Sequence, residues 1–524
     1  MYFRTSKLLG ATALVAVVAL AACSSSSKGT STSTGNNGSS GKTASVASLT
    51  VGSPSGTNGF DPYNCGYGPE QNILLAGYDT LIRAAPDGTF APSLALSWKY
   101  TSPTVFTMTL RTGVTFADGS PMNAAAVAAN LTRASKTFAQ ITAPLALGMQ
   151  SVKAVNPTEV TITLRTPNPD LTTILSTCAG MIVSPKLLGT PTKMATTMDG
   201  TGPYDYDAGA SIAGSSYTFH KKPTYWDSAK FPFKTVVFKV ITDFNTAFNA
   251  IRSGQLDIAV GTPPEIPSAK ASDLASVQGN INFYAVDLRD REGTLVPALK
   301  DVRVRQALNY AIDRDAIIKT FFEDLGRPTD QLLNPHAGGY DSGVDNTYPY
   351  NVQKAKDLLT AAGYPNGFTL PVLSTQGFQL DQILQAISGY WSKIGVKVQD
   401  EVEPVSSWET QLITNKYPAI IFPFSGLPGY TALDQSFGSA SPLNPFHTAN
   451  TALDADLATA ASAPSQANRD TAIKSAQKTL LDQAWYAGVG YDDVIWFTNP
   501  KKVTGLQMQL NQSVPHFYNW QPGS

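Results

Sequence analysis

Short runs that alternate apolar and polar residues are interleaved along this chain with longer runs in which apolar residues recur every three or four positions. Residues 105–110 alternate with the period of a strand, whereas 244–252 repeats apolar residues at helical spacing. Gly254 follows the second run, and a glycine readily adopts the positive φ that ends a helix. The pattern predicts a mixed α and β fold.

Further elements follow from the same periodicity and from capping residues. Asn123 precedes the small apolar residues of 124–133, and Asp301 precedes a helical stripe that begins at Val304. The remaining predicted elements are a strand over 256–260 and a helix over 353–362 that Gly363 and Pro365 close. We interpret these apolar stripes as core and not as cofactor-binding motifs.

The amino terminus has the three-part pattern of an export signal. Arg4 and Lys7 precede an apolar run over 8–20, which is shorter than the ~20 residues that span a membrane. The sequence then reads Leu-Ala-Ala-Cys at 20–23, which resembles the bacterial lipobox. We therefore expect cleavage after residue 22 and lipidation of Cys23; an ordinary Ala-x-Ala cleavage site is the alternative.

The segment that follows has a composition typical of a linker. Residues 24–48 are almost entirely Ser, Thr, Gly, Asn and Ala, so they cannot bury enough apolar surface to offset their ordering entropy. We expect Cys23 and this stretch, 23–48, to form a flexible tether. It would hold an exported protein on the outer face of the cytoplasmic membrane or in a periplasm.

The overall composition limits the possible functions. The 524 residues are 42% hydrophobic and 15% charged, which is enough apolar material for about three domains. The 38 Lys and Arg nearly balance the 39 Asp and Glu, for a net charge of -1. Such a balance does not concentrate a protein on a phosphate backbone, so nucleic acid is an unsuitable partner.

Cysteine usage fits an exported protein. Of the 3 cysteines, lipidation of Cys23 leaves Cys65 and Cys178. An even remainder outside the cytoplasm favours a disulfide between them. Two separately buried thiols are the alternative, because sequence alone does not bring their Cα atoms within reach.

The chain carries a series of short sequence blocks. The blocks are FAPSLALSW at 90–98, LRTGVTFADGSP at 110–121, GTGPY at 200–204, PTYW at 223–226, SGQLDIA at 253–259, DVRVRQALNYAIDR at 301–314 and KAKDLLTAAGY at 354–364. Each block is short, but in this order, from about residue 50 to beyond residue 400, they resemble the bacterial extracellular solute-binding proteins of peptide and nickel ABC importers, known as family 5.

This resemblance implies a two-lobe fold of the type II periplasmic-binding-protein kind, with solute held between the lobes. By analogy, the first lobe comprises 49–283 plus 490–524, with an extra subdomain near 84–180, and the second lobe comprises 284–489. Closure over the solute is favoured only by tighter binding to the closed form, so residues from both lobes should contact it.

The implied function is capture of a small solute, with a peptide as the default, and its delivery to an ABC permease that a separate ATPase drives. The protein should act as a monomer without a cofactor or metal. A ligand-binding module that reports to a membrane sensor is the alternative within the same fold.

The resemblance also implies which residues approach the solute. In the first lobe these are Tyr63, Asn64 and Tyr67, for which an ordinary surface loop is the alternative. In the second lobe they are Trp408, Phe424, Tyr430 and Asp434. Peptide-binding relatives place an acidic residue just after the corresponding strand to hold an ammonium group, and here Asp434 is the nearest acid.

The segment 287–291 departs from the family's neutral pattern. Arg289 or Arg291 can bind an anionic ligand group through its planar guanidinium. The alternative, which we favour, is a solvated charge cluster in which Asp290 and Glu292 neutralise the arginines.

A hydrolase is a third hypothesis, because exported lipoproteins include enzymes. His220, His336, His447 and His516 show no paired zinc spacing, and the chain lacks a Gly-x-Ser-x-Gly elbow. The Ser-x-x-Lys pattern at 475–478 lacks the companion Lys-Thr-Gly of penicillin-recognising enzymes. We therefore predict that the protein is not an enzyme.

Overall fold

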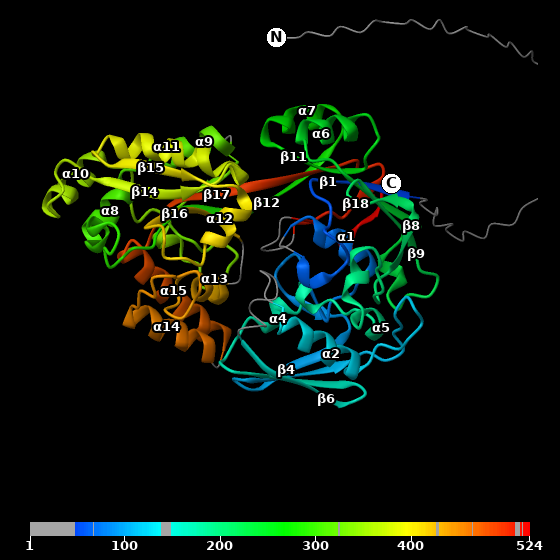
Figure 1. The fold of residues 1–524 in the computed structure, drawn as a ribbon. Helices are drawn as coiled ribbons and strands as arrows, with labels where there is room; N and C mark the ends of the chain where they lie inside the picture. The colour runs from blue at the N-terminus through cyan, green and yellow to red at the C-terminus, as the bar shows by residue number, and fades with distance from the viewer. Residues whose placement is uncertain are drawn as a thin grey trace, which may run out of the picture. The chain divides into compact units, whose positions relative to one another are not determined.

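The computed structural model describes residues 48–65, 68–137, 148–322, 325–425, 429–463, 465–508, 514–515 and 517–523 (Figure 1). The predicted signal sequence, Cys23, nearly all of the predicted tether and Tyr67 lie outside these ranges. In the described part of the chain, no helix combines the length and apolar character needed to cross a membrane.

A long mixed sheet runs through the described residues in the order β15-β14-β16-β12-β17-β11-β1-β10-β9-β8, with β13 paired to β17. Strand β1 is parallel to β10, and β14 is parallel to both β15 and β16, whereas β12 is antiparallel to β16 and β17. The strands are β1 (Ser48–Ser53), β8 (Tyr204–Ile212), β9 (Ser216–Lys221), β10 (Thr235–Val240), β11 (Ile258–Gly261), β12 (Ala275–Leu288), β13 (Arg327–Pro328), β14 (Thr369–Ser374), β15 (Lys397–Val402), β16 (Ala419–Ser425) and β17 (Tyr486–Thr498).

Buried apolar side chains form separate clusters along this sheet, which define two lobes. We call the elements around the clusters that contain Leu49 and Phe248 the first lobe. Those around the clusters that contain Leu308 and Phe437 form the second lobe. The long strands β12 and β17 run from one lobe into the other, and β17 is the red-orange arrow between the two groups of elements in Figure 1.

A second, smaller sheet belongs to the first lobe and has the order β4-β5-β7-β6. Its outer strand β4 begins at Ala95, whose side chain is buried, and then presents exposed and half-buried side chains, whereas β5 and β7 bury alternate residues. This small sheet comprises β4 (Ala95–Ser102), β5 (Val105–Leu110), β6 (Met149–Asn156) and β7 (Glu159–Leu164). The short strands elsewhere are β2 (Ile82–Ala84), β3 (Phe90–Pro92), β18 (Val503–Thr504) and β19 (Gln521–Pro522).

The helices begin where capping residues predict. The side chains of Asn123, Asp243 and Asp301 each accept a hydrogen bond from a backbone amide in the first turn that follows. The described helices of the first lobe are α1 (Glu70–Gly77), α2 (Ala124–Ala134), α4 (Leu171–Ile174), α5 (Pro185–Leu188), α6 (Phe244–Arg252) and α7 (Ile266–Ala271). Those of the second lobe are α8 (Val302–Tyr310), α9 (Arg314–Phe322), α10 (Val352–Ala361), α11 (Leu380–Ser392), α12 (Val405–Gln411), α13 (Gly429–Phe437), α14 (Thr451–Ser462) and α15 (Gln466–Asp482).

Local predictions agree with this structure. Helices α2, α6 and α10 begin and end within one residue of the predicted bounds, and α8 covers the stripe predicted to begin at Val304. Gly254 and Gly363, which follow two of these helices, have φ of 75° and 89°. The strand expected over 256–260 is β11, which begins two residues later. Asp257 is held just before it, because its carboxylate accepts a 2.8 Å hydrogen bond from the Thr50 amide of β1.

Candidate functional site

A cavity of about 730 Å³ lies between the lobes and has walls from both. We call it the interlobe cavity. Its first-lobe wall comes from the small sheet and the segment around α4, and its second-lobe wall comes from 336–338, the start of α13 and the first half of α15. Its volume is within the ~300–1,000 Å³ range of small-molecule sites. Wall residues used below are Trp98, Lys99, Tyr100, Asp170, His336, Tyr430, Thr431 and Arg469.

The lobes are hydrogen-bonded to each other at this cavity. Asp170 precedes α4, and its Oδ2 accepts hydrogen bonds from the amide of Thr431 (3.0 Å) and from the Thr431 hydroxyl (2.6 Å). Both residues are buried, with Asp170 8% and Thr431 4% exposed. Burial raises the pKa of the Asp170 carboxyl, although the Thr431 donors act in the opposite direction. The two lobes therefore meet at a carboxylate.

Helix α13 carries two of the predicted ligand-binding residues to this place. Tyr430 lines the cavity, and Asp434 lies one turn further along the same helix, half-buried. Burial raises the pKa of the Asp434 carboxyl, and the negative charge of Asp170 raises it further, while the Tyr430 hydroxyl lowers it. Two carboxylates that each disfavour the other's charge create a local preference for a cation.

Each wall of the cavity also carries a cationic residue. Arg469 of α15 donates from Nη1 to Oε1 of Gln466 at 2.9 Å, and its buried Nε has no hydrogen-bond partner among the described residues. Lys99 of β4 also lines the cavity, between the aromatic residues Trp98 and Tyr100. The interlobe cavity thus combines acidic, basic and aromatic groups, which suits a small solute that carries both charges.

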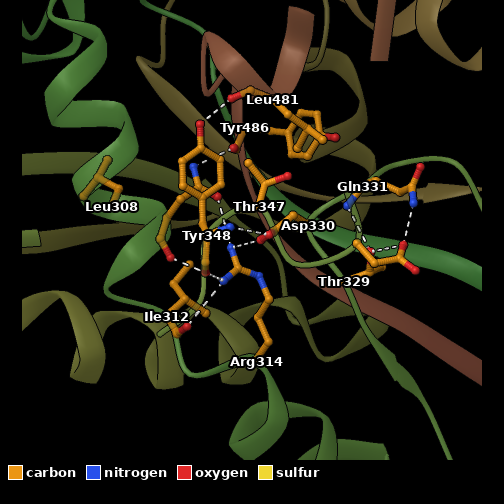
Figure 2. A network of polar contacts seen from close by, with 12 residues as sticks. Leu308, Ile312, Arg314, Thr329, Asp330, Gln331, Thr347, Tyr348, Leu481 and Tyr486 are labelled. Carbon is orange, nitrogen blue, oxygen red and sulfur yellow. Dashed lines mark hydrogen bonds and ion pairs between the residues drawn. The ribbon is translucent and has the colours of Figure 1, made fainter. Parts of the chain in front are cut away.

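A buried polar network holds the segment that contributes His336 to the cavity wall (Figure 2). Asp330 is fully buried, forms an ion pair with Arg314 and accepts a hydrogen bond from the Tyr348 amide at 2.7 Å. Arg314 also donates from Nη1 to the Tyr348 carbonyl at 2.8 Å. The loop that leaves β13 is therefore fixed to α9 and to the residues before α10.

Trp408 and Phe424 form part of an aromatic chain behind the cavity and do not line it. The ring of Trp408 stacks on Phe422 with centroids 5.6 Å apart, and Phe422 contacts Phe424 at 4.8 Å. Both predicted residues are buried, at 3% and 6% exposure. Trp408 Nε1 is buried and has no hydrogen-bond partner among the described residues. The structure therefore groups these residues with α13 through packing.

The ligand-binding residues predicted in the first lobe differ in how far they are buried. Tyr63 is fully buried, its hydroxyl donates to Asn130 Oδ1 at 3.2 Å, and burial raises its pKa. Asn64, the next residue, is exposed. Neither lines the interlobe cavity, and Tyr67 lies outside the described residues. Because Pro62, Tyr63 and Asn64 form one turn of 3₁₀ helix, adjacent side chains point in different directions, and a motif match does not show which one faces solvent.

The same turn is joined covalently to the cavity wall. A disulfide with an S–S distance of 2.07 Å links Cys65 to Cys178, 113 residues apart. Cys178 follows Thr177, which lines the interlobe cavity. The favoured pairing of the two remaining cysteines is thus present in the structure.

The prediction of a solvated charge cluster at 287–291 is wrong. Arg289 and Arg291 are each 4% exposed, and both donate to the carboxylate of Asp287, at 2.9 and 2.6 Å. Asp290, which we expected to neutralise them, is fully buried and instead accepts from three backbone amides of the turn that follows. These arginines have intramolecular partners and do not line the interlobe cavity.

Sequence reasoning missed Asp170, Thr431 and Arg469. The only local signal is that an acid before a short apolar run is typical of a helix N-cap, which predicts a bond to its own helix and not to the other lobe. The Ser-x-x-Lys pattern lies on the exposed side of α15, where Lys478 donates to Asp482 at 2.6 Å. Within the described ranges, no cluster of three or more His, Cys, Asp or Glu side chains could hold a metal ion.

The fold and the cavity between lobes define the class of protein. Solved structures of two-lobe periplasmic binding proteins match 91% of this chain. The structure of AgaA from A. tumefacien R10 in complex with agropinic acid matches at a TM-score of 0.77 with 23% sequence identity, over 99% of its own length. The structure of DppA from Helicobacter pylori in complex with the peptide STSA matches at a TM-score of 0.75 with 20% sequence identity, over 98% of its own length. The chain therefore has the two-lobe periplasmic-binding-protein fold.

The sequence comparisons show the family. The model of the bacterial extracellular solute-binding proteins, family 5, matches residues 89–442, and this chain belongs to that family. The glutathione-binding protein GsiB of Pectobacterium atrosepticum is 29% identical over 485 residues, which cover 88% of this chain and 91% of that protein. The family consists of solute-binding proteins, so this chain is a binding protein and not an enzyme.

Proposed function

We propose that this protein is the lipid-anchored binding component of an ABC importer for a small peptide, and that glutathione or a similar peptide is its solute. The interlobe cavity is the observation that carries the proposal, because solute in it would contact both lobes and so favour closure. The likeness to a glutathione-binding protein over 88% of the chain supports a peptide-like solute.

The charges at the cavity fit the two ends of a short peptide. The carboxylates of Asp170 and Asp434 favour an ammonium group, and the guanidinium of Arg469 on the cavity wall favours a carboxylate. Asp434 and Tyr430 are therefore our proposed contacts for the amino-terminal part of the solute. An ammonium group buried without such a partner costs several kcal/mol.

The other predicted ligand residues have different parts in this proposal. Phe424 supports α13 through the aromatic chain, and Trp408, whose ring lies behind the cavity, stays a prediction from the resemblance. Asn64 stays a proposed contact from the exposed turn, and Tyr67 stays a prediction from the resemblance. The fully buried Tyr63 orients that turn through Asn130 and does not reach the solute.

The proposed lobe boundaries fall within the two crossing strands. The pairing of β12 with β17 shifts register between Asn280 and Phe283, and again between Tyr284 and Ala285. On β17, Gly490 lies opposite Tyr284 with a φ of 145°. These irregularities support changes of lobe near 283/284 and 489/490, because a disrupted ladder bends more easily than a regular one. Phe283 and Tyr491 still pack in the second-lobe cluster that contains Phe437.

The solute is tested by adding reduced glutathione to the purified protein. Isothermal titration calorimetry should show saturable binding at one site, and the melting temperature should rise by mass action. Native mass spectrometry of the protein from its own host identifies a solute that co-purifies. Absence of binding to glutathione and to a panel of di- to tetrapeptides would overturn the peptide proposal.

The anchor is tested separately. Cys23→Ala removes the thiol that receives lipid, so the protein should leave the membrane fraction, whereas Cys65→Ala should remain in it. A Cys23→Ala protein that stays with membranes after washing in high salt would contradict lipidation. Co-purification of permease subunits with the wild-type protein tests delivery of the solute to an importer.

A further inference from the structure

Asp170 occupies the position of a helix cap without capping its own helix. It directly precedes α4, where an aspartate side chain ordinarily accepts hydrogen bonds from the amides of the first turn. Here the side chain makes no such bond, and among the described residues both donors to its Oδ2 belong to Thr431, 261 residues away in the other lobe.

Thr431, which donates both hydrogen bonds to Asp170, also lies at the start of a helix. Thr431 is the third residue of α13, and the first amides of a helix have no partner within the helix itself. A carboxylate that accepts from the third amide is the usual arrangement of an N-cap, and its negative charge is favourable at that end of the helix. Asp170 therefore caps α13 from the opposite lobe.

We infer that Asp170 and Thr431 form a closure latch, a contact that forms when the lobes meet and that fixes α13, the helix of Tyr430 and Asp434, in the geometry that binds solute. This inference rests on the proposed function, because it requires lobes that separate. If the latch forms, the part of the first lobe next to the small sheet directly influences the affinity for solute.

The surroundings of the contact suit reversible formation. Both partners lie on the wall of the interlobe cavity, so opening the lobes lets water reach the Asp170 carboxylate and the Thr431 donors, and no buried group is left unpaired. The neighbouring charges are Arg469 and Asp470 of α15 and Asp434 of α13, which act on the carboxylates in opposite directions. No cation forms an ion pair with Asp170 within the described residues.

The test compares variants that break the contact with variants that keep it. Asp170→Ala removes the acceptor, and Thr431→Val removes the hydroxyl donor at similar volume. Thr431→Ser retains both donors, and Asp170→Asn retains one acceptor oxygen. Thr196→Val changes an exposed threonine of the first lobe that does not line the interlobe cavity. Thermal unfolding establishes that each variant is folded.

Three readouts are measured with and without reduced glutathione: the radius of gyration by X-ray scattering, amide hydrogen exchange of the peptide 429–437, and the glutathione dissociation constant. In Asp170→Ala and Thr431→Val we expect glutathione affinity to fall about tenfold, exchange of 429–437 to accelerate and the compact fraction to shrink. The double variant should lose no more than either single variant, because both remove one contact. Thr431→Ser and Thr196→Val should match the wild type.

The failure of the latch is distinguishable from failure of the proposed function. If glutathione compacts the wild type and the Asp170→Ala and Thr431→Val proteins equally, with unchanged exchange over 429–437, the latch is overturned and solute-driven closure stands. If the wild type binds glutathione without compaction, the closing motion itself is contradicted, and the latch with it.

Discussion

Asp330 and Asp170 are both buried carboxylates of the same chain, but they differ in what surrounds them. Asp330 lies inside the second lobe, paired with Arg314 and bonded to the Tyr348 amide, in a network that fixes several segments (Figure 2). Asp170 lies between the lobes, and within the described part of the chain its side chain accepts from the two donors of Thr431 alone. Contacts within a lobe are therefore numerous and charge-compensated, whereas the contact between lobes is small enough to exchange with water.

Among contacts within a lobe, removal of the disulfide should lower the free energy of unfolding most. Replacing Cys65 and Cys178 together by serine opens a covalent loop of 113 residues, and the free energy of unfolding should fall by about 4 to 5 kcal/mol in the chain-entropy model. Denaturant unfolding monitored by tryptophan fluorescence measures the loss. A double variant as stable as the wild type would show that the bond does not restrain the unfolded chain.

Removal of Asp330 should have the next largest effect. Asp330→Ala leaves the buried Arg314 without its ion-pair partner, and breaking a buried pair typically costs about 3 to 5 kcal/mol of unfolding free energy. Asp482→Ala is the matched control, because it removes an exposed ion pair with Lys478, for which we expect less than about 1 kcal/mol. Equal losses in the two variants would remove the distinction between buried and exposed carboxylates.

Asp434, one turn beyond the cavity-lining Tyr430 on α13, tests the proposed contact with the ammonium group. Asp434→Asn keeps the size of the side chain but removes its charge, so binding of glutathione should weaken by about 1 to 3 kcal/mol when the ammonium group lies against it. Calorimetry of the variant measures the change, and Asp454→Asn serves as a control on neighbouring α14. Unchanged affinity would exclude Asp434 as the counter-ion.

The smallest expected effect is a dependence of closure on pH. Burial raises the pKa of Asp170 in the closed form, so that form binds the proton more tightly than an open form in which the carboxyl is solvated. Lowering the pH through the raised pKa should therefore increase the compact fraction. Arg469 opposes this shift, whereas Asp470 adds to it.

Asp170→Asn should remove that part of the pH dependence, because the amide is neutral throughout. Scattering curves recorded for both proteins from neutral to acidic pH make the comparison. Identical pH profiles for the variant and the wild type would show that another group controls the response.

Local chemistry explains what the sequence could predict. Helices behind Asn123 and Asp301 follow from caps and periodicity that lie within a few residues of each other, and the family blocks imply the two-lobe fold. The Asp170–Thr431 contact joins residues 261 positions apart, so no local pattern indicates it. Arg289 and Arg291 were misjudged because charged residues usually remain solvated, whereas here they directly follow a strand that continues into the core.

Burial also limits what a motif match can say about a site. Tyr63 and Asn64 are adjacent in the same predicted ligand segment, but one is fully buried and the other is exposed. Tyr430 lines the interlobe cavity, while Trp408 and Phe424 reach it only through packing. Resemblance identifies the segment near a solute, and only the three-dimensional packing determines which side chain faces it.

The two crossing strands have a mechanical consequence. Because β12 and β17 are hydrogen-bonded neighbours over much of their length, they form a two-stranded strap. A strap flexes readily across its broad face but resists sliding within its plane, since sliding would break ladder hydrogen bonds. Sliding of one lobe past the other is therefore restrained, and each swing should bring Asp170 back to the same end of α13.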